Sequence, residues 1–270
     1  MVSITDCVVE GLKYPFNDIK KLLGLGVFFT IFNLLALAFT SKSTQIIIYA
    51  NRQGEVLALN LPTGDIYTIA CLAIICFIVS IFIMGYQYDL ISFSINKRED
   101  LPGFRDILNI FLNGIKFFIV GFGYNIIPGV LLIIGLMLMS FQSYQYYILV
   151  VISAILVVIA FFLQIMALNN MIANDSLKKA FDFKDIFNKI SGLGWVKYIG
   201  IILFTLIVSV IIMIAAEFVL GFLTVLFTMA FSQVMIVSIF VGIIEGLFIS
   251  SYGSIFFARV CGSIYRQSVK

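Results

Sequence analysis

Six long apolar runs divide the chain, and each is close to or above the length that crosses a membrane as a helix. A hydrocarbon core of roughly 30 Å requires about 20 predominantly apolar residues in an α-helix. The pattern therefore predicts an all-α, polytopic membrane protein with six transmembrane helices. The runs cover about residues 21–39, 66–94, 110–139, 147–171, 195–219 and 234–260.

A short motif of the form Phe-x-Asp-Ile stands before the first, third and fifth apolar runs. Three copies at long spacing indicate an internal repeat. We predict a single transmembrane domain over residues 1–270, made of three parallel hairpins with repeat boundaries at about 14–95, 102–173 and 181–264. The Phe and Asp residues of the motif are Phe16 and Asp18, Phe104 and Asp106, and Phe183 and Asp185.

The residues around each motif alternate between apolar and polar positions at helical spacing. In the second copy Phe104, Ile107 and Leu108 fall on one face, and Arg105 and Asp106 fall on the other. A short amphipathic helix beside a membrane span lies in the headgroup plane. We predict one such interfacial helix before each hairpin; the alternative is that each copy is only the polar start of a long transmembrane helix.

The longest connection within a hairpin is predicted over residues 40–65. Two β-prone runs, Gln45–Tyr49 and Glu55–Leu59, flank a turn that contains Gly54, which is typical of a β-hairpin. A loosely ordered loop is the equal alternative, since an isolated two-stranded hairpin is marginal in water.

Pro128 in the third run predicts a kink, because proline removes one backbone hydrogen bond and clashes with the preceding turn. Asn125, three residues earlier, is placed to satisfy a freed carbonyl, as the membrane interior requires. We favour a packed kink over the alternative, a broken helix that lines a cavity.

Composition excludes several function classes. Charged residues make up 11% of the chain, less than half of the roughly 25% in an average soluble domain. The net charge of only +3 argues against a nucleic-acid partner. The chain has no histidine, the commonest general base and metal ligand, and its four cysteines lack zinc-type spacing. We predict no catalytic residue, no metal site and no cofactor.

Basic residues predict the orientation in the membrane. Of the 17 Lys and Arg residues, all except Lys42 and Arg52 lie on the side that carries the three motifs and both termini. Cytoplasmic loops carry the Lys and Arg excess. We therefore predict a multi-pass protein of the cell membrane with both termini in the cytoplasm.

The candidate buried polar residues are Glu245, Asn125 and Gln164. Glu245 lies roughly 17 Å along the sixth span, near the midplane, where a carboxylate costs at least about 2.5–3.5 kcal/mol. Gly242 and Gly246 form a Gly-x-x-x-Gly pattern that allows another helix to approach closely. One interpretation is a protonated acid hydrogen-bonded across this contact, with Asn125 as the predicted partner. The other is a proton- or cation-coupling site.

Three sequence features resemble a prokaryotic six-span family, domain of unknown function 4013, which is frequent in methanogenic archaea. They are Gly85-Tyr86 near the end of the second span, Asp100-Leu101-Pro102 before the second amphipathic segment, and Pro128 in the third span. The resemblance covers most of the chain. It implies an integral membrane protein with no established activity and no catalytic residues to transfer.

We expect a non-enzymatic membrane protein that organises lipids or partner proteins through its interfacial helices. The lipid bilayer is the expected partner, and other membrane proteins or a second copy of the chain are further candidates. The alternative is a small-solute or ion transporter or channel in which Glu245 is a coupling or ligand group. A lipid-modifying enzyme has the least support, because no acid, base and metal ligands converge in the sequence.

The charge asymmetry gives a test of orientation in intact cells. A cysteine introduced at Gly54 is expected to react with a membrane-impermeant thiol reagent, because Gly54 is predicted to face outside. The native Cys7 and Cys261 are expected to stay unlabelled. Labelling of either native cysteine would contradict the predicted orientation.

Overall fold

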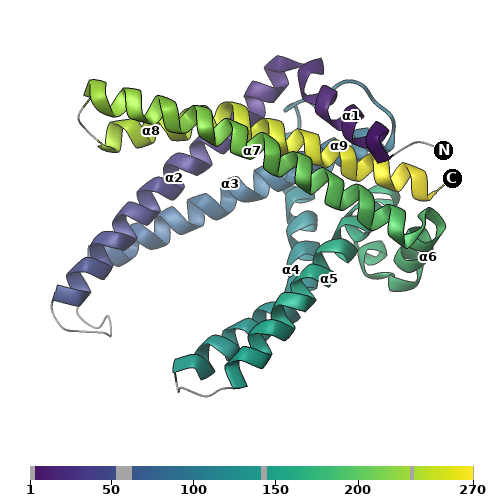
Figure 1. Cartoon of the computed structure of the whole chain (residues 1–270), viewed down its shortest axis with the longest axis horizontal. Coiled ribbons are helices and arrows are strands. Elements are labelled where there is room, and N and C mark those ends of the chain that lie inside the picture. The colour runs from purple at the N-terminus through teal and green to yellow at the C-terminus, as the bar shows by residue number, and fades with distance from the viewer. Residues whose placement is uncertain (1–3, 53–62, 141–144, 232–233, 270) are drawn as a thin grey trace. The chain divides into compact units, whose positions relative to one another are not determined.

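The computed structural model describes residues 4–52, 63–140, 145–231 and 234–269 (Figure 1). These residues form helices joined by short connections, and no strand occurs among them. The predicted all-α fold is confirmed. Six helices are long and apolar enough to cross a membrane, which indicates a multi-pass membrane protein. The candidate spans are Ile19–Ile48, Gly64–Ile95, Ile107–Met139, Tyr146–Asn174, Trp195–Met229 and Met235–Ser268.

The helices follow one another with few intervening residues. In chain order they are α1 (Ile4–Lys13), the 3-10 helix η1 (Tyr14–Asn17), α2 (Ile19–Arg52), α3 (Thr63–Ile95), α4 (Ile107–Ser140), α5 (Gln145–Asn174), the 3-10 helix η2 (Leu177–Phe181), α6 (Phe183–Leu193), α7 (Trp195–Phe231), α8 (Val234–Ile244), the π-helical turn η3 (Glu245–Ser250) and α9 (Ser251–Ser268). Because α8, η3 and α9 are contiguous, they form the sixth span together.

Of the transmembrane helices, α2 and α7 extend furthest past the ends that the sequence pattern predicted. α2 continues to Arg52, so the predicted β-run Gln45–Tyr49 is wrong. The other half of that predicted hairpin, Gly54 and Glu55–Leu59, lies outside the described residues. α7 continues to Phe231, past the predicted end of the fifth span.

Hydroxyl groups explain why these helices continue through polar sequence. Thr44 donates to the Thr40 carbonyl at 2.9 Å, and Thr228 donates to the Thr224 carbonyl at 2.7 Å. A threonine that bonds one turn back along its own helix is satisfied without leaving the helix. No Gly or Pro interrupts residues 27–53 either, so nothing in this stretch breaks α2.

The repeated motif takes two different structural forms. In its first copy Phe16 and Asn17 lie in η1, and the long helix α2 begins at Ile19. In its second copy α4 begins at Ile107, and the described residues 101–106 before it form no helix. The prediction of a distinct interfacial helix is therefore wrong for the second copy and stays a prediction for the first. In the third copy α6 is a separate helix, and Gly194 divides it from α7. α1, which the sequence pattern did not predict, precedes the first copy.

The acidic residue of the motif starts a helix in two of the three copies. Asp18 and Asp106 each accept a hydrogen bond from the backbone N–H three residues later, at 3.2 Å and 3.1 Å. This is the N-cap arrangement, which satisfies one of the free N–H groups at a helix start. For α6 the same role falls to Asp182, which accepts from the N–H of Asp185 at 3.2 Å. In the third copy the capping residue, Asp182, therefore lies three residues before the Asp of the motif, Asp185.

α4 continues as a helix across Pro128, so the broken-helix alternative is wrong. The Ser153 hydroxyl of α5 donates to the Pro128 carbonyl at 2.8 Å. Asn125 donates to the Gly121 carbonyl at 2.8 Å and to Gln164 Oε1 of α5 at 3.0 Å. α4 and α5 lie side by side (Figure 1), and these hydrogen bonds join them within the membrane segment.

The chain forms two compact units, each made from segments that are distant in sequence. The first unit comprises residues 1–17, 84–207 and 256–270, and the second comprises residues 18–83 and 208–255. In the first unit α5 packs against α4, η2 and α6. In the second unit α2 packs against α8 and η3. The three-hairpin repeat and the similar membrane depth of its copies stay predictions.

A buried arginine holds three segments of the first unit together. Arg259 of α9 is 1% exposed, and its guanidinium lies 2.8 Å from the carboxylate of Glu10 in α1. It also donates to the Arg98 carbonyl at 2.6 Å, and Glu99 lies at 3.5 Å. The Tyr14 ring lies 4.2 Å from the guanidinium carbon. Arg259, itself in α9, therefore links this helix to α1 and to the connection that follows α3.

The residues that carry the family resemblance meet in the same unit. An added Cβ at Gly85 would lie 1.8 Å from the Ile110 carbonyl oxygen, so α3 and α4 pack closely only because this residue has no side chain. Tyr86 donates to the Pro102 carbonyl at 2.9 Å, and Leu101 is fully buried. These residues fix the connection between α3 and α4.

The two terminal cysteines are buried in this unit, which affects the labelling test of orientation. Cys7 is 1% exposed and Cys261 is 5% exposed. Burial raises the pKa of the Cys7 thiol, so little of the reactive thiolate is present. Protection of these cysteines would not distinguish the two sides of the membrane. A cysteine at the exposed Lys13 is the better reporter for the side of the membrane that carries α1.

Loss of the Glu10 charge is expected to destabilise the first unit. Glu10→Gln leaves the buried Arg259 with only the more distant, exposed Glu99 as an ionic partner, and it also removes the ion pair between Glu10 and Arg266 at 2.6 Å. Because Glu10 is 35% exposed, we expect the free energy of unfolding to fall by about 1–3 kcal/mol, the cost of leaving a buried group without a partner. Glu217→Gln, the same change at an exposed acid, is the control. Equal denaturation curves for the two variants in detergent would contradict the assigned role of Arg259.

Candidate functional site

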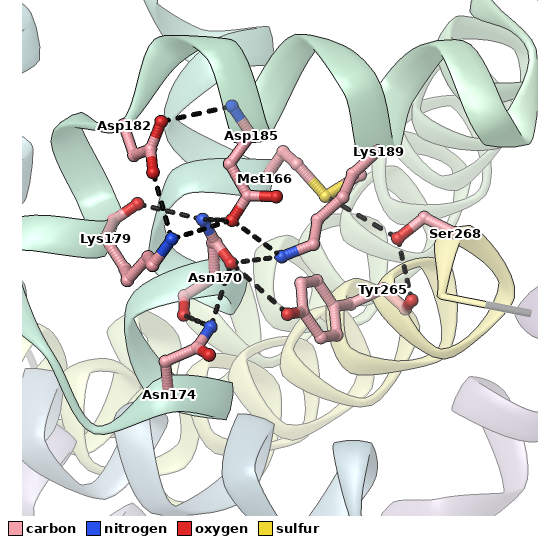
Figure 2. Close-up of polar contacts among 9 residues, drawn as sticks. All are labelled: Met166, Asn170, Asn174, Lys179, Asp182, Asp185, Lys189, Tyr265 and Ser268. Atoms are coloured by element: carbon pink, nitrogen blue, oxygen red, sulfur yellow. Dashed lines mark hydrogen bonds and ion pairs between the residues drawn. The ribbon is translucent and has the colours of Figure 1, made fainter.

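Polar side chains from η2, α5, α6 and α9 converge on Asn170, which is fully buried (Figure 2). Its amide group donates to the Lys179 carbonyl at 2.9 Å and to Asp185 Oδ2 at 3.1 Å. Its side-chain oxygen accepts from Lys189 and from the Tyr265 hydroxyl, the latter at 3.3 Å. The cluster therefore ties α6 and α9 to the end of α5.

The charges in this cluster are mutually compensated. Lys179 lies 2.9 Å from Asp182, and its hydrogen bond holds the pKa of that carboxyl below its usual range. Burial would raise the pKa of Asp185, but hydrogen bonds from Asn170 and Lys189 lower it. Both groups therefore stabilise the folded chain above the ordinary carboxyl pKa, and this contribution is lost as the pH falls through their lowered pKa values. Because each of these charges has a partner, we interpret the cluster as a structural contact between helices.

A polar cleft of about 530 Å³ lies elsewhere in the first unit, beside the second copy of the motif. Asp106 lines it, with Asp89, Lys116 and Asp175. Lys116 forms an ion pair with Asp175 at 2.9 Å, and Tyr88 donates to the same carboxylate at 3.2 Å. Asp89 accepts a hydrogen bond from Asn113 at 3.0 Å, and Asp106 accepts one from the Asn109 N–H at 3.1 Å. Each acid of the cleft therefore already has a hydrogen-bond partner within the protein.

The second unit is organised by a contact between small residues. An added Cβ at Gly246 would lie 2.5 Å from the Thr30 backbone nitrogen, and one at Gly26 would lie 2.5 Å from the Leu247 carbonyl oxygen. An added Cβ at Gly242 would lie 3.9 Å from the Cβ atom of Asn33. The structure thus places both glycines of the Gly-x-x-x-Gly pattern against α2, as close packing between membrane helices requires.

Glu245 begins the π-helical turn at the centre of this contact. A π turn changes the backbone hydrogen-bond register, and such turns occur frequently at functional sites. Thr30 donates to the Ile243 carbonyl at 3.4 Å, and Asn33 donates to the Gly242 carbonyl at 3.3 Å. Side chains of α2 thus supply hydrogen bonds to carbonyls just before the turn, where the membrane offers no water to do so.

The Glu245 side chain lines a cleft of about 470 Å³ in the second unit. Within the part of the chain that the structure describes, its carboxyl group makes no hydrogen bond and no ion pair. No Lys or Arg is among the described residues that line the cleft. The other polar lining residues are amides and hydroxyls: Asn33, Thr40, Thr224, Thr228 and Ser238. We therefore take this cleft as the candidate functional site.

The free carboxyl is the unusual feature of this cleft. A charged carboxylate near the middle of a bilayer costs about 2.5–3.5 kcal/mol or more without a partner. Here the groups within the cleft can supply hydrogen-bond donors and oxygen ligands, but no fixed positive charge. In a bilayer, neutralisation of Glu245 would therefore require a proton or a cation from outside the described cleft lining. One interpretation predicted that Glu245 forms a hydrogen bond across the packed contact. Among the described residues its side chain forms no such bond.

The other predicted polar residues are not among the described residues that line the cleft. Asn125 and Gln164 are hydrogen-bonded to each other in the first unit. Asn125 therefore uses its amide within the α4–α5 pair, and no hydrogen bond between Asn125 and Glu245 occurs among the described residues. The sequence analysis did not identify Thr224 and Thr228, because both lie between the predicted fifth span, which ends at about residue 219, and the sixth, which begins at about residue 234. Their i, i+4 spacing was the available signal that both share one helix face.

Comparison with known proteins assigns a family and gives no activity. A family model described as "Protein of unknown function (DUF4013)" matches residues 68–224. No curated protein and no solved structure matches the chain. The matched segment includes the resembling residues Gly85-Tyr86 and Asp100-Leu101-Pro102, and it confirms that resemblance.

The close contact at Gly246 can be tested with a matched pair of substitutions. Gly246→Ala is expected to destabilise the protein by about 1–3 kcal/mol, because the new methyl group overpacks against the backbone of Thr30. Gly253→Ala, in the same span, meets nothing within 4 Å and is expected to be neutral. Thermal unfolding in detergent measures both. A smaller effect for Gly246→Ala than for Gly253→Ala would contradict the packing described.

Proposed function

The chain belongs to the DUF4013 family of proteins of unknown function, and from this premise we propose that it carries a proton or small cation through the membrane. The proposal is of a non-enzymatic, multi-pass protein of the cell membrane with both termini in the cytoplasm. One observation carries it: the Glu245 carboxyl lies inside a candidate span, lines a cleft with largely apolar walls, and has no hydrogen-bond or ion-pair partner among the described residues. An ionisable residue within a membrane segment marks a functional site by default.

The lining of the cleft suits a hard cation better than a large organic solute. Carboxylate, amide and hydroxyl oxygens are the ligands that hard cations prefer, and Thr40, Thr228 and Ser238 contribute such oxygens beside Glu245. The cleft of about 470 Å³ has room for an ion with part of its water shell. Leu34, Leu37 and Val241 form apolar walls, which strengthen electrostatic attraction by excluding water.

Removal of the titratable group in Glu245→Gln is expected to abolish flux while the fold is retained. Glutamine keeps the shape and hydrogen-bonding capacity of the side chain, but it neither titrates nor balances a cation. The purified chain is reconstituted in liposomes, and proton, Na⁺ and K⁺ flux is followed with ion-sensitive dyes. Asp6→Asn, the matching change at an acid of α1 that lies outside the six candidate spans, is expected to keep wild-type flux. Equal flux of all three ions with and without the wild-type protein, or undiminished flux in Glu245→Gln, would refute the proposal.

A second candidate function is the organisation of lipids or partner proteins at the membrane surface. The observation that favours it is α6, whose surface exposes the aromatic residues Phe183 and Phe187. This function requires no flux. A protein that fails the liposome assay but retains a specific surface interaction would fit this second candidate.

A further inference from the structure

The position of α6 in the chain places it at a membrane surface. It lies between two candidate spans that end at Asn174 and begin at Trp195. Gly194 makes the turn between α6 and α7 with a φ of +92°, a left-handed conformation that favours glycine. Its N–H donates to the carbonyls of Ile190 and Ser191, at 2.9 Å and 3.1 Å. Because the next residue already starts a span, α6 cannot extend far from the bilayer.

α6 has two apolar faces, and only one is covered by the protein. Ile186 and Ile190 are fully buried. Phe183 and Phe187 lie one helical turn apart on the neighbouring face and are 49% and 44% exposed. The Trp195 ring, 40% exposed, lies 5.7 Å from the Phe187 ring. Exposed aromatic rings at the end of a span are typical of residues that enter the headgroup region.

The exposed charge beside these rings is positive. Lys184 follows Phe183 in α6, and Lys178 lies in η2; both are exposed. Neither forms an ion pair among the described residues. The nearby acids differ, because Asp182 and Asp185 are both bonded to lysines of the Asn170 cluster. The surface therefore presents uncompensated lysines next to an apolar aromatic patch.

The protein holds this surface in a fixed position. The Tyr124 hydroxyl of α4 donates to the Ala180 carbonyl at 2.7 Å. The Tyr124 ring also lies 5.8 Å from the ring of Phe181 and 5.9 Å from that of Phe183. The Asn170 cluster secures the opposite side of α6 (Figure 2). A lipid that binds here meets groups that are already ordered, which lowers the entropic cost of binding.

We infer that the α6 surface, formed by Lys178, Phe183, Lys184, Phe187 and Trp195, binds the headgroups of anionic phospholipids. The aromatic rings enter the boundary between headgroups and acyl chains, and the two lysines pair with lipid phosphates. Basic residues at a membrane surface attract anionic lipids in this way. The inference deepens the second candidate function by naming the lipid class, and it does not depend on the Glu245 cleft.

The chain contains its own reporter, because Trp195 is the only tryptophan. The full-length protein is placed in phosphatidylcholine nanodiscs that contain an equal mole fraction of brominated lipid, either phosphatidylglycerol or phosphatidylcholine. Bromine quenches tryptophan fluorescence at short range. We expect brominated phosphatidylglycerol to quench Trp195 at least about twofold more strongly than brominated phosphatidylcholine. Raising the salt concentration is expected to reduce this preference.

The variants locate the preference on the α6 surface. In the double variant Lys178→Gln, Lys184→Gln, the fluorescence of Trp195 is expected to be quenched equally by the two brominated lipids. The double variant Lys13→Gln, Lys20→Gln removes the same charge from exposed lysines of α1 and α2 and is expected to keep the wild-type preference.

Three outcomes would overturn the inference: equal quenching of the wild type by the two lipids, no quenching by either, or equal loss of preference in both double variants. Glu245→Gln is expected to keep the preference. Failure of the cation proposal and failure of this inference are therefore separate results.

Discussion

The interior of a bilayer leaves no backbone polar group without an internal partner, and the structure follows from that constraint. It explains why α2 and α7 continue as helices through polar sequence, with Thr44 and Thr228 bonded one turn back. It also explains how α4 passes Pro128, where hydrogen bonds to α5 support the segment. At the π turn, Thr30 and Asn33 supply the hydrogen bonds that the changed backbone register needs. In both places a side chain of a neighbouring helix donates a hydrogen bond to a backbone carbonyl beside the irregular residue.

The two compact units use polar groups in opposite ways. In the first unit, Arg259 and Asn170 each collect several partners, and the charges around them are compensated. Such networks fix the geometry of the segments that they join. In the second unit, Glu245 has neither a cation nor a hydrogen-bond partner among the described residues, although hydroxyl groups line the same cleft.

The repeated motif shows how one sequence pattern serves two structural purposes. Phe-x-Asp-Ile in its first two copies caps a membrane helix through Asp18 and Asp106. In the third copy Asp182 takes over the cap, and Asp185 is released to join the Asn170 cluster. A separate α6 results, with one face on the protein and one face exposed. The local pattern is the same in each copy, and the difference arises from what the surrounding segments offer as partners.

The sequence by itself determined the all-α class, the six apolar spans and the family, and it placed Glu245 inside an apolar run, because hydrophobic length is a local property. It did not determine where α2 and α7 end, since hydroxyl groups within a helix are locally indistinguishable from those in a loop. It also could not show that Asn125 pairs with Gln164, or that Gly246 contacts Thr30. Those features depend on which residues meet across distant segments. Only tertiary packing decides such contacts, because each partner satisfies its hydrogen bonds or fills its space only after the other is in place.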